Sequence, residues 1–176
     1  MPKTKDTKPS KGTPKIELPG LTLIVGYDLP ALDVLMKLAG DKSCLVLDRP
    51  ETGEHPVRQR AFARLLARHV SAGGKALVAT HSDYLIKELN ILIMLGGKDE
   101  HLARVRKNHY YAPDEALDHK RVRCYTTEVD KNQRYVGIGA KCPVDEEFGI
   151  EVPTFDGTIN EQNDICIEIR FGGVLD

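Results

Sequence analysis

An acidic and a basic side chain each follow a short apolar segment, and together they could serve one chemical site. Asp48 comes directly after Leu45-Val46-Leu47, and His81 follows the apolar run 76–79. A carboxylate at the end of a buried strand can hold a divalent cation, and histidine exchanges protons near neutral pH. Arg49 follows the acid, and an arginine stays protonated and cannot act as a base.

The elements around these residues alternate between strand and helix. Short apolar runs with no polar alternation are typical of buried parallel strands, and apolar residues three and four apart indicate helices. Right-handed strand–helix–strand units on a parallel sheet follow from this order. The expected strands cover 21–25, 44–47 and 76–79, and the expected helices cover 30–40, 56–71 and 83–96.

Each of the three expected helices has a stripe of apolar residues along one face, which is expected to pack against the core. Pro30 suits the first turn of the first helix, and Gly40 suits its end. The apolar residues of the stripes are Leu32, Leu35, Met36 and Leu38 in the first helix, Phe62, Leu65, Leu66, His69 and Val70 in the second, and Tyr84, Leu85, Leu89, Leu92 and Ile93 in the third. Ligands of such sheets bind at the carboxyl ends of the strands, so we expect Asp48 and His81 to face one site.

Two glycine pairs and one polar triplet are excluded as catalytic motifs. Gly73-Gly74-Lys75 and Gly96-Gly97-Lys98 lack the spacing and the following Ser or Thr of a phosphate-binding P-loop, and no P-loop occurs in the sequence. They are predicted to end helices. His81-Ser82-Asp83 cannot form a hydrolytic triad, because adjacent side chains point in different directions; Ser82 or Asp83 is expected to cap the following helix.

Residues 45–95 read LVLDRPETGEHPVRQRAFARLLARHVSAGGKALVATHSDYLIKELNILIML. This segment resembles the C-terminal half of the ATPase core in ABC-class ATPases of the SMC and OLD type, which include many AAA-labelled ATPases of bacterial phage defence and DNA repair. The shared pattern is an apolar strand, Asp-x-Pro-Glu, His-Pro, a glutamine, a helix, a strand and Thr-His-Ser. The likeness extends more loosely to GIEVPTFDGTINEQN, residues 149–163.

The resemblance implies a role for each matching residue. Asp48 matches the Walker B acid, which would hold Mg²⁺ through water and so neutralise charge on a transferring phosphoryl group. Glu51 matches the second acid, and His81 matches the switch histidine that contacts the γ-phosphate and orients water. Gln59 and Tyr84 match supporting positions. Arg49 replaces the catalytic glutamate and could pair with Asp48 or Glu51 or contact a phosphate.

The other half of such a site has no counterpart in the sequence. The serine- and glycine-rich signature loop would precede the helix at residue 30, but the residues there are Gly26-Tyr27-Asp28-Leu29-Pro30. Asp28 would repel a γ-phosphate. A parallel sheet without its P-loop strand would lack a central neighbour, and its open edge would favour oligomerisation.

The expected function is therefore that of a degenerate or truncated ABC-class ATPase half, inactive alone. ATP and Mg²⁺ are its implied ligands, and a P-loop-bearing subunit or a second copy is its implied partner. The alternative is a non-catalytic protein-interaction or nucleic-acid-binding module with a vestigial nucleotide site. That module would use the C-terminal hairpin or the arginines at 58, 60, 64 and 68, which otherwise form a solvated helix face. A hydrolase using His81 as its base is a third option.

Composition and the positions of the cysteines limit the possible partners and the cellular compartment of the protein. The chain has 176 residues and a formal net charge of −1, so binding to nucleic acid would need a local patch. No apolar run is long enough for a membrane span, and no secretory signal is recognisable. Cys44 and Cys166 are interpreted as small buried apolar residues in a reduced, cytoplasmic protein. A metal site from Cys124, Cys142 and His119 fits no standard zinc spacing.

Three regions are expected along the chain. Residues 1–15 are lysine-rich and predicted to be disordered, and residues 16–97 form the ATPase-like half. Residues 98–176 form a smaller α+β region. Alternating residues at 121–129 and 134–139, separated by a polar turn, predict a β-hairpin there. The Ile-Cys-Ile-Glu-Ile run at 165–169 is compatible with helix or strand.

Overall fold

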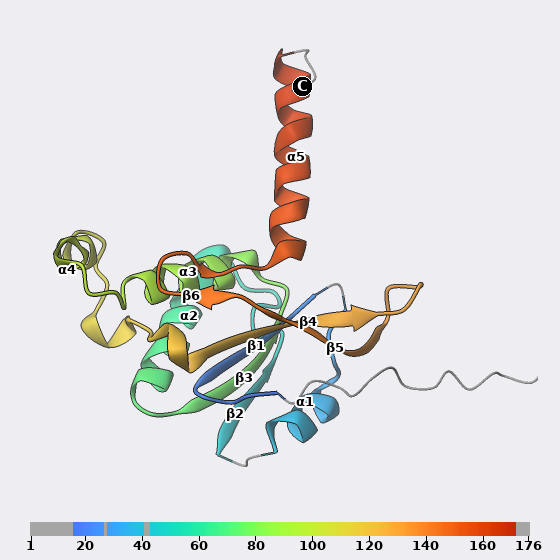
Figure 1. Cartoon of the computed structure of the whole chain (residues 1–176), viewed down its shortest axis with the longest axis horizontal. Helices are drawn as coiled ribbons and strands as arrows, with labels where there is room; N and C mark the ends of the chain where they lie inside the picture. The colour runs from blue at the N-terminus through green and yellow to red at the C-terminus, as the bar shows by residue number, and fades with distance from the viewer. Residues whose placement is uncertain (1–15, 27, 41–42, 172–176) are drawn as a thin grey trace, which may run out of the picture.

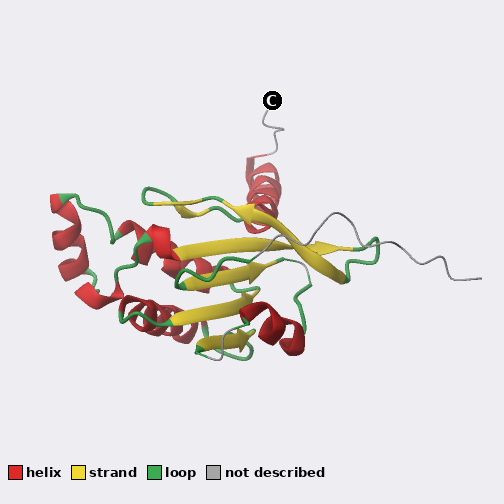
Figure 2. Ribbon diagram, turned by 60° about the horizontal axis from the view of Figure 1, so that its bottom comes forward, coloured by secondary structure: helices red, strands yellow, loops and turns green. Residues whose placement is uncertain are grey.

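A five-stranded, mostly parallel sheet carries the fold. The computed structural model describes residues 16–26, 28–40 and 43–171, so the lysine-rich tail at 1–15 lies outside it. The strands are arranged in the order β2-β3-β1-β4-β5 (Figure 2). They are β1 (Leu21–Val25), β2 (Cys44–Asp48), β3 (Lys75–Thr80), β4 (Val122–Val129) and β5 (Tyr135–Cys142). The first four run parallel, and β5 returns antiparallel to β4, which confirms the predicted α/β class and the predicted hairpin.

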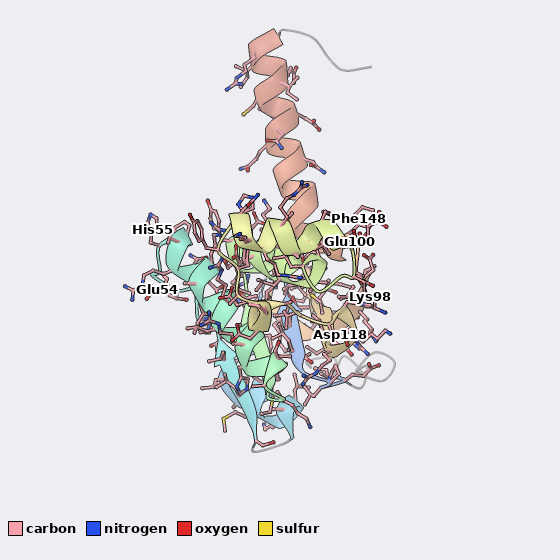
Figure 3. All side chains as sticks on the ribbon, turned by 90° about the vertical axis from the view of Figure 1, so that its left-hand side faces the viewer. Glu54, His55, Lys98, Glu100, Asp118 and Phe148 are labelled. Atoms are coloured by element: carbon pink, nitrogen blue, oxygen red, sulfur yellow. The ribbon has the colours of Figure 1, made fainter. Side chains whose placement is uncertain are left out.

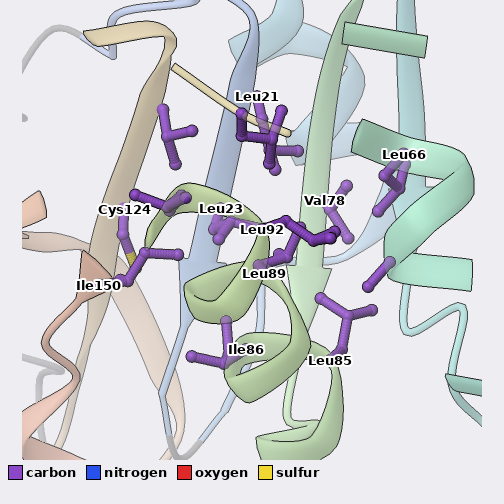
Figure 4. Close-up of a cluster of buried hydrophobic side chains, with 14 of the residues drawn as sticks. Leu21, Leu23, Leu66, Val78, Leu85, Ile86, Leu89, Leu92, Cys124 and Ile150 are labelled. Carbon is purple, nitrogen blue, oxygen red and sulfur yellow. The ribbon is translucent and has the colours of Figure 1, made fainter. Parts of the chain in front are cut away.

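Helices cover both faces of the sheet and complete three layers. α1 (Leu32–Ala39) packs on one face with Ile24 and Leu77. α2 (Pro56–Ser71) and α3 (Asp83–Met94) pack on the other face (Figure 1). Leu89 and Leu92 of α3 lie against Leu23 and Val78 in this second core (Figure 4). α1 connects β1 to β2, and α2 connects β2 to β3, as expected for strand–helix–strand units on a parallel sheet.

β1 occupies the middle of the sheet, and this corrects the expectation of a missing central neighbour. It pairs with β3 on one side and β4 on the other, and all five of its residues have 0% exposure. Within this five-stranded sheet, the strands with a single pairing partner are β2 and β5. Leu45 of β2 is 41% exposed for this reason. The strand that ends in Asp48 therefore lies at the rim of the sheet.

The predicted helix stripes are only partly correct. Leu35 and Leu66 are buried as expected, but Leu65 and Tyr84 are 58% and 52% exposed. The residues of α2 that face the core are Ala63, Leu66, Ala67 and Val70. Alanines at helix–sheet contacts allow close approach, and the arginines and larger residues of α2 are displaced to the flanks. Leu32 and Met36 of α1 are likewise exposed, because α1 is a short helix near the rim.

The C-terminal region continues the same sheet and then leaves it. It contains α4 (Glu100–Asn108), the short helices η1 (Pro113–Glu115) and η2 (His119–Arg121), and a two-stranded ribbon of β6 (Val144–Asp145) and β7 (Gly149–Ile150). The last segment is α5 (Pro153–Phe171), so the Ile-Cys-Ile-Glu-Ile run is helical. α5 stands away from the body with side chains projecting on more than one side (Figures 1 and 3). Cys166 is exposed on it, which corrects its interpretation as buried.

The predicted arginine face of α2 is bound to buried acids. Glu88 of α3 is 1% exposed and accepts hydrogen bonds from Arg60 Nε at 2.6 Å and Arg64 Nε at 3.1 Å. Tyr111 Oη donates a third hydrogen bond to Glu88, and its ring lies 4.0 Å from the Arg64 guanidinium carbon. Glu88 also raises the pKa of Arg60. These contacts join α2 to α3 and to the segment before η1.

Glu115 completes the network at the other end of α2. It is 3% exposed, accepts a hydrogen bond from Arg68 Nη2 at 2.8 Å, and accepts another from the Ala112 amide at 2.8 Å. Buried carboxylates require such partners, because an unpaired buried charge is strongly destabilising. Arg58, by contrast, is an exposed residue paired with Glu54. Arg60, Arg64 and Arg68 therefore each have a buried acidic partner, although the side chains of Arg60 and Arg68 are still 49% and 46% exposed.

Removing the two cationic partners of Glu88 should destabilise the protein. We expect the Arg60→Met, Arg64→Met double variant to lose about 3–5 kcal/mol of unfolding free energy in urea, since a buried carboxylate is left unpaired. The control Arg58→Met should stay within about 0.5 kcal/mol. Adding Glu88→Leu to the double variant should recover most of the loss; no recovery would show that packing alone explains the effect.

Candidate functional site

Asp48 and His81 do lie at the same edge of the sheet. β2 and β3 are paired in register, with Asp48 opposite Ala79, so both strands end at one level. His81 follows two residues after Ala79. The carboxylate of Glu51 connects the two loops, because its Oε1 accepts a hydrogen bond from the His81 backbone amide at 2.8 Å. The structure therefore brings together three of the residues that the sequence singles out.

The guanidinium group of Arg49 binds both carboxylate oxygens of Asp48. Its Nε donates to Asp48 Oδ1 at 2.9 Å, and its Nη2 donates to Asp48 Oδ2 at 3.0 Å. This pair raises the pKa of Arg49. The Arg49 backbone is fixed as well, since its amide donates to the Ala79 carbonyl at 2.8 Å. The sequence left open whether Arg49 pairs with Asp48, pairs with Glu51 or contacts a phosphate; in the structure it pairs with Asp48.

Arg49 also adopts an unfavourable backbone conformation. Its φ angle is +44°, in the left-handed region where a side chain other than that of glycine is strained. The turn that follows is held by the Thr52 amide, which donates to the Arg49 carbonyl at 3.1 Å. Strain of this kind persists where surrounding contacts fix the chain, and it concentrates at functional sites.

The second oxygen of Glu51 has no hydrogen-bond partner among the residues that the structure describes. Glu51 Oε2 is buried as an atom, whereas Oε1 is taken by the His81 amide. An unsatisfied buried carboxylate oxygen is costly, and in native proteins it calls for a cation, a water molecule or a donor. Thr127 Oγ1 of β4 is the other buried side-chain oxygen without a partner among the described residues.

Gln59 ties the two helices of the site together. Its Nε2 donates to the Glu54 carbonyl at 2.7 Å, and its Oε1 accepts a hydrogen bond from Ser82 Oγ. Ser82 Oγ in turn accepts from the Leu85 amide at 2.9 Å, which confirms Ser82 as the N-cap of α3. Both polar groups of the Gln59 side chain are thus engaged inside the protein.

His81 and Tyr84 present their side chains to solvent. The His81 side chain is exposed, although its backbone amide is fixed by Glu51. Tyr84 is 52% exposed one turn further along. At the start of α2, Glu54 and His55 lie at the rim of the molecule (Figure 3). The imidazole of His81 is therefore accessible to a ligand or to a partner.

Asp28 adds negative charge beside the same edge. Its Oδ1 accepts from the Leu29 amide at 3.1 Å and its Oδ2 from the Tyr135 amide at 2.8 Å, so it joins the loop after β1 to β5. The charges of Asp28 and Glu51 contribute to the raised pKa of Arg49. One guanidinium therefore faces three carboxylates, a balance that disfavours a phosphate. The link to Tyr135 has no signal in the sequence, because 107 positions separate the two residues.

A shallow pocket lies on the outer side of this loop. Its volume is about 280 Å³, and its lining includes Pro50, Glu54, Arg58, Gln59, Phe62 and Leu65. Neither Asp48 nor His81 contributes to it. Within the described ranges, no group of three or more His, Cys, Asp or Glu side chains could hold a metal ion, so Cys124, Cys142 and His119 do not form the metal site considered from the sequence.

Comparison of the chain with protein-family models, with curated proteins and with solved structures finds no match in any of the three. Among the described helices, none is long and apolar enough to cross a membrane.

The strain at Arg49 can be measured by comparing two substitutions. Arg49→Gly and Arg49→Ala both remove the ion pair with Asp48, but only glycine tolerates the positive φ angle. We expect Arg49→Gly to be more stable than Arg49→Ala by about 1 kcal/mol in urea unfolding. Gly53→Ala is the matched control: its φ is +76° and an added Cβ meets nothing within 4 Å, so it should lose a similar amount. Equal stability of the two Arg49 variants would mean that the loop relaxes.

Proposed function

We propose that this chain is a degenerate ABC-class ATPase half that does not hydrolyse ATP by itself. The observation that carries the proposal is the hydrogen bond from the His81 amide to Glu51, which holds the ends of β2 and β3 together with Asp48 between them. The resemblance assigns these three residues to the Walker B and switch-histidine side of an ATP site. The sequence contributes no P-loop to the other side.

The residues as arranged do not fit a Mg²⁺ ion. Both oxygens of Asp48 are bound by Arg49, and Glu51 Oε2, which has no partner among the described residues, is buried. Mg²⁺ needs near-octahedral oxygen coordination and tolerates a guanidinium beside it poorly. The position of the catalytic glutamate is held by an arginine that cannot accept a proton. The chain alone is thus better suited to an inactive state than to turnover.

A partner would have to supply the phosphate-binding half. A P-loop-bearing subunit would bring the backbone amides and the lysine that hold phosphates. It would also have to draw Arg49 away from Asp48 before a metal ion could bind. A second copy of this chain brings no P-loop, so a homo-oligomer would stay inactive toward ATP.

One observation favours the alternative of a non-catalytic binding module with a vestigial site. The bidentate Arg49–Asp48 pair satisfies the acid internally, as expected once a nucleotide site has lost its ligand. In that case the arginines of α2 do not form the binding surface, because Arg60, Arg64 and Arg68 are paired with Glu88 and Glu115. Of the two surfaces suggested from the sequence, this leaves the C-terminal hairpin for a partner.

Metal binding tests the half-site directly. Mn²⁺ replaces Mg²⁺ and its binding can be followed by electron paramagnetic resonance. We expect the wild-type chain to bind it with a Kd of about 1 mM or weaker, and Arg49→Ala to bind about tenfold more tightly because Asp48 becomes free. The double variant Arg49→Ala, Asp48→Asn should lose this gain. If Arg49→Ala binds no better than the wild type, Asp48 is not the metal side of a nucleotide site.

Steady-state hydrolysis provides the second test. The purified chain should show no ATP turnover above background, and restoring the acid in Arg49→Glu should not create any, because the P-loop is still absent. Robust turnover by the wild type that disappears in Asp48→Ala would overturn the proposal. Co-purification separates the alternatives: a nucleotide-dependent P-loop partner supports the ATPase half, and a nucleotide-independent partner supports the binding module.

A further inference from the structure

Two cysteines face each other across the C-terminal hairpin. Cys124 of β4 and Cys142 of β5 are direct cross-strand partners in the antiparallel pairing. Both side chains belong to the same core, with exposures of 0% and 5%, so they point to the same side of the sheet. Both are free thiols. The nucleotide site does not use them.

The spacing of this pair is close to that of a disulfide. Directly opposite residues in an antiparallel pair have Cβ atoms about 4.5–5.5 Å apart, and a disulfide requires about 3.5–4.5 Å. The remaining difference is small, and the hairpin can adjust at this end. Cys142 is the last residue of β5, and the pairing shifts register between Tyr125 and Thr127. The segment that must move is therefore short and not held by a continuous ladder.

We propose that Cys124 and Cys142 form an intramolecular disulfide when the protein meets an oxidised low-molecular-weight disulfide such as oxidised glutathione. The bond would close the open end of the hairpin. The other end is already closed by Asp130, whose side chain accepts hydrogen bonds from the amides of Asn132 and Arg134. Oxidation thus locks the register of β4 against β5.

The chemistry needs only the two thiols and the external disulfide. The Cys142 thiolate attacks one sulfur of the small disulfide, forms a mixed disulfide and releases one thiolate. Cys124 then gives up its proton and attacks Cys142 Sγ, which releases the second thiolate. The two cysteine thiols are oxidised, the small disulfide is reduced to two thiols, and these take up the two protons. The Cys124 thiol donates toward Cys142, which lowers the pKa of Cys142 and raises that of Cys124, and so favours Cys142 as the first nucleophile.

The lock has a consequence beyond the hairpin. β4 pairs with β1, and the Tyr135 amide of β5 donates to Asp28 in the loop after β1. A fixed β4–β5 register therefore restrains the strand pair that supports Asp28. The inference stands on the cysteine geometry alone and does not depend on the nucleotide proposal.

The test uses the full chain carrying Cys166→Ser, since exposed Cys166 would react on its own. The folded protein is equilibrated with graded ratios of oxidised to reduced glutathione, quenched with acid, denatured and alkylated for mass spectrometry. We expect a Cys124–Cys142 linked peptide with Cys44 still alkylated. Folding should lower the required oxidised-to-reduced ratio by about tenfold or more relative to the urea-unfolded chain. The midpoint of thermal unfolding should rise by about 6 °C on oxidation.

Two results would overturn the inference. One is that both thiols stay alkylatable at the highest oxidised ratio. The other is that each thiol carries its own glutathione without a link between them. The variant Cys142→Ser is the matched control for the thermal shift: if it folds, oxidised glutathione should leave its midpoint unchanged. If it does not fold, the peptide measurement on the Cys166→Ser chain still decides the question.

Discussion

The position of β1 in the middle of the sheet is the constraint on which the rest of the structure depends. β1 pairs with β3 on one side and β4 on the other, and all five of its residues are buried. It thus joins β2 and β3 to the C-terminal hairpin in one sheet. Both cores need it as well, since Leu23 faces α2 and α3 while Ile24 faces α1. Without β1, β3 and β4 would each present an open edge to solvent.

The candidate site follows from this arrangement, but most of its polar groups are bound by other residues of the protein. The strand ends bring Asp48, Glu51 and His81 together, as in a metal-dependent site, and the neighbouring contacts then satisfy most of their polar groups. Arg49 binds both oxygens of Asp48, Gln59 is used between the Glu54 carbonyl and Ser82, and Asp28 joins β5. Among these groups, Glu51 Oε2 is buried without a described partner, and the side chain of His81 is exposed. The internal Arg49–Asp48 ion pair is consistent with the proposed inactive half of an ATP site.

The sequence could predict what local patterns determine. Apolar runs and glycine positions located the strands and the first three helices. The cap of the third helix was expected at Ser82 or Asp83, and the position of Asp48 and His81 at one edge of the sheet followed from the parallel strands. The predictions that were wrong concern contacts between residues far apart in the sequence. Arg60, Arg64 and Arg68 appeared to be a surface face because Glu88 and Glu115 lie far along the chain. The central place of β1 was missed because strand order is not encoded in local periodicity, and Leu65 and Tyr84 were assigned to the core because periodicity alone cannot show which flank of a stripe meets the sheet.

Amide hydrogen exchange of the isolated chain tests most directly whether β1 completes the sheet without a partner. The account predicts that the amides of β1 exchange among the slowest in the protein, by global unfolding, and that those of the rim strand β2 exchange sooner. Exchange in β1 as fast as in β2 would contradict it. Such a result would mean that the centre of the sheet is open in the isolated chain, and that another molecule is needed to fill it.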